Sequence, residues 1–293
     1  MQRKPSWLKA EMLGASHTAN MNRLISRYKL QTVCESARCP NRGECFEKGS
    51  AVFLIMGDEC TRNCSFCAIK TTKNPLPLDS DEPKRVAELT KEIGLKHVII
   101  TSVTRDDLED GGAEHFARTI REIRKVCGES IYIEVLTPDF MGNTSAINAV
   151  INEKPTIFNH NLETIKRLYS KIRPQADYNR SLGLLKYVKE NIPEIITKTG
   201  IMVGLGETDE EVVTLMKDTR EAGVNMLTIG QYLQATKQNL PVKEFIHPEI
   251  FRQYKEKGED MEFLYVESGP LVRSSYYSLD LETIINNEGK RGM

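Results

Sequence analysis

The sequence predicts an α/β fold, a partial (β/α)6 TIM-like barrel whose opening is covered by extensions at both ends of the chain. From residue 51 onward, a short apolar run followed by a charged segment with helical spacing recurs six times. Strands that alternate with helices favour parallel pairing through right-handed crossovers. Six units are fewer than the eight of a complete barrel, so other parts of the chain have to cover the gap.

The expected strands are short, apolar and partly β-branched, as buried parallel strands are. They are AVFLIMG from Ala51, HVIITSV from His97, IYIEVL from Ile131, TIFNHN from Thr156, TKTGIMVGL from Thr197 and NMLTIG from Asn225. The expected helices have charged outer faces. They run from Pro83 to Gly94, Ala113 to Val126, Ala176 to Glu190 and Asp209 to Ala222.

The length of 293 residues fits one large core with extensions, because single cores stop growing at about 250–300 residues. We expect an amino-terminal extension over residues 1–50, a barrel over 51–240 and a carboxyl-terminal extension over 241–293. All three are expected to form one compact unit. We expect the two extensions to cover the open side of the barrel.

The charge balance argues against nucleic acid as a partner, because 40 Lys and Arg face 41 Asp and Glu, a net charge of −1. Neither a signal peptide nor an apolar run of roughly 20 residues is visible, so we expect a cytoplasmic protein without a membrane segment. A reducing cytoplasm keeps the seven cysteines as thiols that can bind metal.

Three cysteines, Cys60, Cys64 and Cys67, follow the first expected strand directly, at the end where α/β barrels build active sites. A four-iron cluster takes four ligands, so three thiolates would leave one iron open to an outside donor. A structural zinc ion is the alternative, but it prefers four ligands in closely spaced pairs. The triad therefore favours a reactive cluster.

This Cys-x3-Cys-x-aromatic-Cys pattern, with Phe66 as the aromatic residue, resembles the signature of the radical S-adenosylmethionine (SAM) enzymes. The resemblance implies that the open iron chelates the methionine part of SAM. An electron from the cluster then cleaves the carbon–sulfur bond, and the resulting 5′-deoxyadenosyl radical abstracts hydrogen from an unactivated carbon. It also implies a SAM pocket, to which we assign Phe66, together with Gly111 and Gly112 after the second strand, Gly204 on the fifth and Gln231 after the sixth.

A second triad, Cys34, Cys39 and Cys45, lies before the barrel and so indicates a second metal site. The triad itself does not identify the fourth ligand of this site. Candidates are Cys127, a histidine, or an oxygen ligand from the carboxyl-terminal extension. Cys127 ends an expected helix, and a buried structural thiol is its more ordinary role.

The spacing Cys-x4-Cys-x5-Cys, followed by the radical signature and by Arg273-Ser274-Ser275-Tyr276, resembles the lipoyl synthase family along nearly the whole chain. The resemblance implies that Ser275, or alternatively Ser274, is the fourth ligand of an auxiliary cluster. The family pattern continues with alanine where this chain has Ser278. An oxygen ligand matches iron less well than sulfur does, which suits a cluster that is dismantled in turnover.

The resemblance further implies two [4Fe-4S] clusters, SAM, and insertion of two sulfur atoms at carbons 6 and 8 of a protein-bound octanoyl-lysine. The auxiliary cluster would supply the sulfur. Implied partners are an octanoylated lipoyl domain or glycine-cleavage H protein, a low-potential donor such as ferredoxin or flavodoxin, and an iron–sulfur carrier.

Two alternative functions stay open. One is radical SAM sulfur insertion into a free small molecule, and the other is a two-cluster electron-transfer protein without a substrate. Radical abstraction needs no general base at the carbon, so we assign no acid–base role to the run Arg105-Asp106-Asp107.

Overall fold

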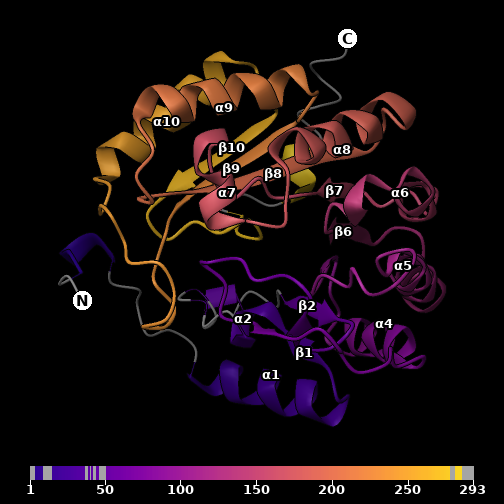
Figure 1. The fold of residues 1–293 in the computed structure, drawn as a ribbon. Coiled ribbons are helices and arrows are strands. Elements are labelled where there is room, and N and C mark those ends of the chain that lie inside the picture. The colour runs from indigo at the N-terminus through magenta and orange to yellow at the C-terminus, as the bar shows by residue number, and fades with distance from the viewer. Residues whose placement is uncertain are drawn as a thin grey trace. The chain divides into compact units, whose positions relative to one another are not determined.

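The structure is a computed structural model that describes residues 4–8, 15–36, 39, 41, 44–45, 51–277 and 281–285. It divides into two units, which are described separately: one is Ala10–Phe158, and the other combines Met1–Lys9 with Asn159–Met293 (Figure 1).

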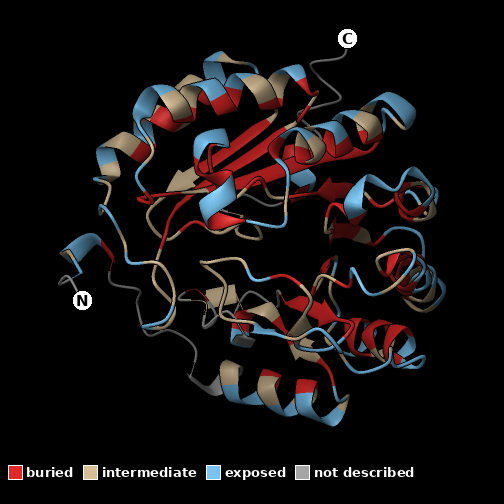
Figure 2. Ribbon diagram, in the orientation of Figure 1, coloured by how far each residue is buried: buried red, intermediate tan, exposed pale blue. Residues whose placement is uncertain are grey.

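The first unit is built on parallel strands β2 (Val52–Ile55), β5 (His97–Ser102) and β6 (Tyr132–Leu136), in that order. Strand β1 (Gln31–Thr32) pairs with β2 in the antiparallel sense, and β7 (Ile157–Asn159) spans the boundary with the second unit. The strands are almost entirely buried (Figure 2). The cysteine loop adds the short parallel pair β3 (Glu59–Cys60) and β4 (Lys70–Thr71).

Helices of the first unit cover the strands with their apolar sides. In α5 (Ala113–Cys127), buried Ala113, Phe116, Ala117, Ile120 and Ile123 recur at helical spacing, which explains both the helix and the face that it buries. The other elements are α1 (Ala15–Arg27), α2 (Val33–Ser36), α4 (Glu82–Glu92), α6 (Thr144–Ile151) and the 3-10 turn η2 (Phe140–Gly142).

The second unit contains parallel strands β8 (Ile196–Val203), β9 (Met226–Gln231) and β10 (Tyr265–Gly269). Its helices α8 (Tyr178–Asn191), α9 (Asp209–Glu221) and α10 (Pro248–Asp260) lie along one face of these strands (Figure 1). The remaining elements are η1 (Ser6–Leu8), η3 (Lys166–Leu168) and α7 (Tyr169–Ile172).

Side-chain caps fix where the helices of the second unit begin. Thr208 and Glu211 form a reciprocal capping box at the start of α9, and Asp177 accepts a hydrogen bond from the Arg180 amide at the start of α8. Pro248 occupies the first turn of α10, where a missing N–H costs nothing. These signals are local, so the sequence predicts the starts of α8 and α9 closely.

All six predicted strands and all four predicted helices are present in the described residues. Strand β10 was missed, because a polar Glu267 and the Ser268-Gly269 pair interrupt its apolar pattern. The extension expected over residues 241–293 therefore adds a further parallel strand beside β9. The three-part division of the chain stays a prediction.

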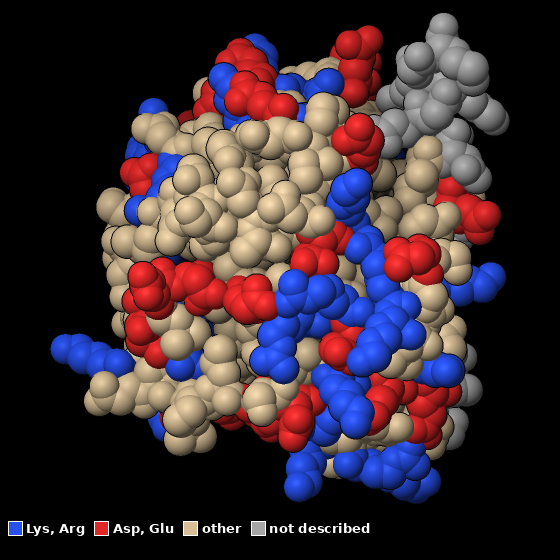
Figure 3. Space-filling view, turned by 90° about the vertical axis from the view of Figure 1, so that its right-hand side faces the viewer, with Lys and Arg blue, Asp and Glu red and all other residues tan. Residues whose placement is uncertain are grey.

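The surface carries both signs of charge. Lys and Arg are interspersed with Asp and Glu on the face shown in Figure 3. No helix within the described ranges is both long and apolar enough to cross a membrane.

Candidate active site

The loop after β2 presents Cys60, Cys64 and Cys67. Positive φ angles of 68° at Met56 and 85° at Gly57 turn the chain away from β2 and into this loop. The Cys67 amide donates a hydrogen bond of 3.0 Å to the Cys64 carbonyl, which places these two residues on one turn. All three cysteines and Phe66 are half-buried, so the loop packs against the unit without being fully enclosed by it.

Backbone N–H groups point at the sulfurs of this loop. The amides of Arg62 and Thr104 each lie 3.4 Å from Cys60 Sγ, and the Ile69 amide lies 3.5 Å from Cys67 Sγ. Such hydrogen bonds surround the sulfurs of iron–sulfur sites. The loop therefore fits a cluster. Among the described residues no three His, Cys, Asp or Glu side chains form a ready-made metal site, so this assignment rests on the N–H···S contacts and the position of the loop.

A buried arginine ties the cysteine loop to its neighbours. Arg62 Nε lies 2.6 Å from Asp106 Oδ2, and Arg62 Nη2 lies 2.6 Å from Asp139 Oδ1. The side chains of Arg62 and Asp139 are 3% and 0% exposed. Asp106 follows β5 and Asp139 follows β6, so one guanidinium joins three loops at the same end of the strands. Burial alone would lower the pKa of Arg62, but the hydrogen bonds that it donates to both carboxylates raise it above its ordinary value.

Thr61 reinforces this connection through the backbone. Its amide and its hydroxyl each donate to the Thr104 carbonyl at 3.0 Å, and its hydroxyl accepts from the Asp106 amide at 3.0 Å. The loop after β5 therefore holds Thr61, the residue that follows Cys60, through both its backbone and its side chain.

A side chain at Gly111 or Gly112 would crowd its neighbours. A Cβ atom at Gly112 would lie 2.2 Å from Met56 Sδ, and one at Gly111 would lie 3.1 Å from Phe140 Cδ1. Both glycines have positive φ angles, 61° and 87°, which glycine adopts without strain. They let the loop before α5 pack onto the chain that leaves β2, and their approach to SAM stays a prediction.

The first triad lies in the same unit as the second. Cys34 is buried in α2, and its carbonyl accepts a 3.1 Å hydrogen bond from the Cys39 amide. The Cys45 amide donates to the Asn41 carbonyl at 2.9 Å. Cys127 ends α5, where burial raises the pKa of its thiol and its sulfur lies 3.8 Å from the Ala87 carbonyl, which fits a packing role.

Gln231 and Gly204 lie together in the second unit. A Cβ at Gly204 would lie 2.2 Å from Gln231 Nε2. That amide nitrogen donates to the carbonyls of Val203 and Glu244, and Gln231 Oε1 accepts from the Ile246 amide. Gln231 thus joins the ends of β8 and β9 to the segment that follows them, and its role in a SAM pocket stays a prediction.

The Arg273–Tyr276 motif forms a turn in the second unit, closed by a 2.9 Å hydrogen bond from the Tyr276 amide to the Arg273 carbonyl. Ser274 faces strand β8, since its Cβ lies 3.1 Å from the position that a Cβ of Gly200 would take. Ser275 is half-buried at the other central position of the turn. Ser278, where the chain departs from the family pattern, lies outside the described residues.

Comparison with known proteins decides which family this site belongs to. Residues 54–219 match the model of the radical SAM superfamily. The chain is 55% identical over 276 residues to a lipoyl synthase of Caldanaerobacter subterraneus subsp. tengcongensis, covering 94% of this chain and 96% of that protein. The chain belongs to the lipoyl synthase family. A lipoyl synthase of Caldicellulosiruptor bescii is 50% identical over 290 residues, 98% of both chains.

Solved structures support the fold. Methylornithine synthase (PylB) aligns with a TM-score of 0.54 and 14% identity over 97% of this chain and 95% of its own. The hydrogenase maturase HydG aligns with a TM-score of 0.60 and 13% identity, over 80% of this chain and 53% of its own. The predicted α/β partial barrel is thereby confirmed. The predicted enzyme class is also confirmed, and as a lipoyl synthase of the radical SAM type the protein uses two [4Fe-4S] clusters and SAM.

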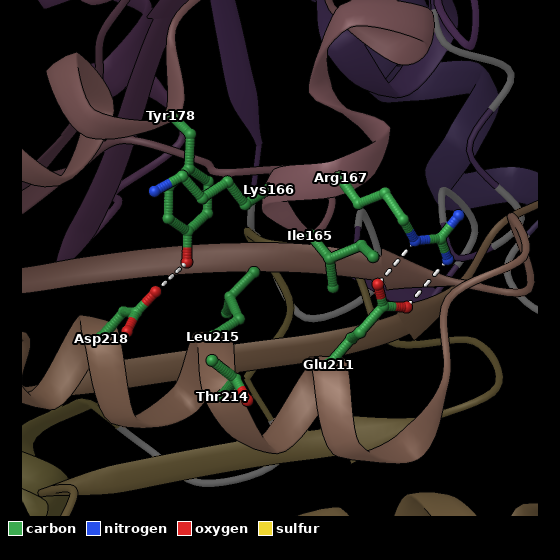
Figure 4. Close-up of a pocket in the computed structure, with 8 residues that line it drawn as sticks. All are labelled: Ile165, Lys166, Arg167, Tyr178, Glu211, Thr214, Leu215 and Asp218. Atoms are coloured by element: carbon green, nitrogen blue, oxygen red, sulfur yellow. Dashed lines mark hydrogen bonds and ion pairs between the residues drawn. The ribbon is translucent and has the colours of Figure 1, made fainter.

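A hollow of about 370 Å³ lies elsewhere in the second unit, between η3, α8 and α9 (Figure 4). Arg167 Nε lies 2.6 Å from Glu211 Oε1, the Tyr178 hydroxyl donates to Asp218 at 2.7 Å, and Lys166 Nζ lies 5.9 Å from the centre of the Tyr178 ring. These contacts join η3 and α8 to α9 across the hollow, so its residues stabilise the packing of these helices.

Sequence reasoning missed the residues that hold the cysteine loop in place. The sequence gives Asp106 no role beyond a polar run, and it distinguishes neither Arg62 nor Asp139 from other charged residues. The one local signal was an arginine enclosed between two cysteines in CTRNC. Its partners lie 44 and 77 positions away, so no local pattern connects them.

We predict that Asp139→Asn destabilises the protein by about 3 kcal/mol, because it leaves the buried Arg62 charge incompletely compensated. Anaerobic urea unfolding measures the loss. Asp79→Asn is the matched control, since Asp79 pairs with the more exposed Arg85, and its cost is expected to stay below about 1 kcal/mol. Equal costs for the two variants would contradict a special role for Asp139.

We predict that Glu211→Gln lowers stability at pH 7 by about 1 kcal/mol, because Glu211 serves both the capping box and Arg167. The hydrogen bond from Arg167 lowers the pKa of Glu211 from 4.5 to about 2. Its stabilisation is therefore complete above pH 4.5 and is lost as the pH falls toward 2. Unfolding curves across this range should show the variant approaching wild type, whereas the neighbouring Glu210→Gln control should match wild type throughout.

Proposed function

We propose that this protein inserts two sulfur atoms at carbons 6 and 8 of an octanoyl group carried on a lysine of a small protein. The observation that carries the proposal is identity of 50–55% with lipoyl synthases over nearly the whole chain. The conformation of the cysteine loop supports it, because a loop with N–H groups directed at its sulfurs suits a cluster with one open iron.

In this proposal Cys60, Cys64 and Cys67 hold the first cluster, and the glycine loop of Gly111 and Gly112 lies beside SAM. When bound, the cluster and SAM supply the radical that abstracts hydrogen from the octanoyl carbons. The chain's own task is to keep the thiolates and the surrounding loops rigid. Arg62 serves this task, because its two carboxylate partners hold the loop from two neighbouring strand ends.

The auxiliary cluster is a substrate in this scheme, held by Cys34, Cys39 and Cys45 and by one serine oxygen. We favour Ser275 over Ser274 as that ligand, because the Ser274 side chain packs toward Gly200 of β8. Oxygen binds iron less firmly than thiolate does, so this ligand would be the first to release an iron when sulfide leaves.

The proposal names three kinds of partner. The substrate is an octanoylated lipoyl domain or glycine-cleavage H protein. A low-potential donor such as ferredoxin or flavodoxin supplies the electron, and an iron–sulfur carrier rebuilds the consumed cluster. Thiolate ligands persist in a reducing compartment, so we place the protein in the cytoplasm.

Iron and sulfide analysis after anaerobic reconstitution tests the proposal. We expect about eight irons per chain before turnover and about four after one turnover with an octanoylated carrier, together with methionine and 5′-deoxyadenosine. Protein that holds only about four irons at the start would contradict it. Product from free octanoate but not from the carrier would favour sulfur insertion into a free small molecule.

Single cysteine variants separate the two clusters. We predict that Cys60→Ala abolishes 5′-deoxyadenosine formation, whereas Cys39→Ala retains it but forms no sulfur-containing product. Cys127→Ala is the matched control, because its thiol packs near the Ala87 carbonyl, and both activities should stay near wild type. Mass spectrometry of the carrier and chromatography of the nucleoside give the two readouts. Sulfur insertion by Cys39→Ala at the wild-type rate would exclude the first triad as the sulfur source.

A further inference from the structure

A lysine lies fully buried in the second unit. Lys198 belongs to β8, and its exposed fraction is 0%. Its ammonium nitrogen lies 2.7 Å from the Tyr277 hydroxyl and 3.9 Å from the centre of the Tyr277 ring. A buried ammonium group is costly unless hydrogen bonds and charge interactions offset its desolvation. Tyr277 supplies both kinds of contact, so the lysine gives this tyrosine a defined place.

Tyr277 is also fixed from a second strand. Its ring stacks on Tyr265 of β10, with centres 6.2 Å apart and planes 17° from parallel. The Tyr265 hydroxyl donates a hydrogen bond to the Glu267 carboxylate on the same strand. Tyr277 is thus held by two residues, Lys198 of β8 and Tyr265 of β10.

The chain between β10 and Tyr277 lies directly against β8 and β9, where glycines make room for it. A Cβ at Gly230 of β9 would lie 2.1 Å from the Val272 carbonyl oxygen. A Cβ at Gly200 of β8 would lie 3.1 Å from Ser274 Cβ. Contacts this close fix the path of the segment along the two strands.

We propose that Lys198 is a positioning residue that anchors Tyr277 and thereby fixes the Arg273–Tyr276 turn. This inference rests on the proposed function, in which a serine of that turn binds the auxiliary cluster. Tyr277 is only two residues beyond Ser275, so a fixed tyrosine leaves the serine little freedom to move. The anchor keeps the turn in place when the oxygen–iron bond breaks during turnover.

Hydrogen exchange on the protein without substrate tests the anchor directly. Lys198→Met removes the charge and keeps an unbranched side chain of similar length. We expect exchange of the Val272 and Tyr276 amides, which donate hydrogen bonds within this segment, to rise about tenfold or more. Exchange along β8 and β9 should stay at wild-type values. Tyr277→Phe removes only the hydroxyl and retains the ring, so its increase should be smaller.

Lys217→Met on the exposed side of α9 is the matched control and should leave every rate unchanged. Unchanged exchange of the segment in both Lys198→Met and Tyr277→Phe would overturn the proposal. So would an increase that extends equally over β8 and β9, because it would mean general loss of structure. If Lys198→Met does not fold, Tyr277→Phe alone decides between these outcomes.

Turnover gives the functional readout. In Lys198→Met we expect 5′-deoxyadenosine formation near the wild-type level but a lower yield of carrier with two sulfurs, because the radical step does not use this turn. Full sulfur insertion with a freely exchanging turn would show that Lys198 has no positioning role. A wild-type protein that inserts no sulfur would refute the proposed function, whereas the exchange experiment would still test the anchor.

Discussion

The structure of the candidate site depends on one buried ionic contact, the guanidinium of Arg62 between the carboxylates of Asp106 and Asp139. Taking these charges out of water is expensive, and only near-ideal geometry with several hydrogen bonds offsets the cost. The contact in turn makes the loops around the cysteines rigid. Three loops at the ends of three successive strands are held together at a point between Cys60 and Cys64, where a cluster would tolerate little movement.

Close packing against a glycine is the second constraint, and it occurs in both units. In the first unit Gly112 packs against Met56, and in the second unit Gly230 packs against the Val272 carbonyl. The first contact seats the loop before α5 beside the cysteine loop. The second seats the chain that carries the serine turn. The positions of the cysteine loop and of the serine turn therefore depend on glycine at these two places, where a side chain would crowd its neighbour.

The sequence predicted the repeating part of the fold well, because apolar strands and capped helices are encoded locally. Thr208 and Glu211 form the capping box that starts α9, and both residues can be recognised in the sequence. The apolar run of β2 is typical of a buried strand. Strand β10 escaped prediction because its pairing with β9, and not its composition, makes it a strand. Long-range contacts such as Arg62 with Asp139 leave no periodic trace. A lysine inside the apolar strand TKTGIMVGL was the one visible sign that Lys198 had a partner.

The central claim is that three thiolates of the loop after β2 leave one iron open to SAM. Electron paramagnetic resonance of a Cys34→Ala/Cys39→Ala/Cys45→Ala variant, which retains only this triad, tests the claim most directly. We predict that adding SAM to the reduced variant changes the shape and g-values of the cluster signal, because the methionine part of SAM would bind the open iron. A signal that SAM leaves unchanged would contradict the account.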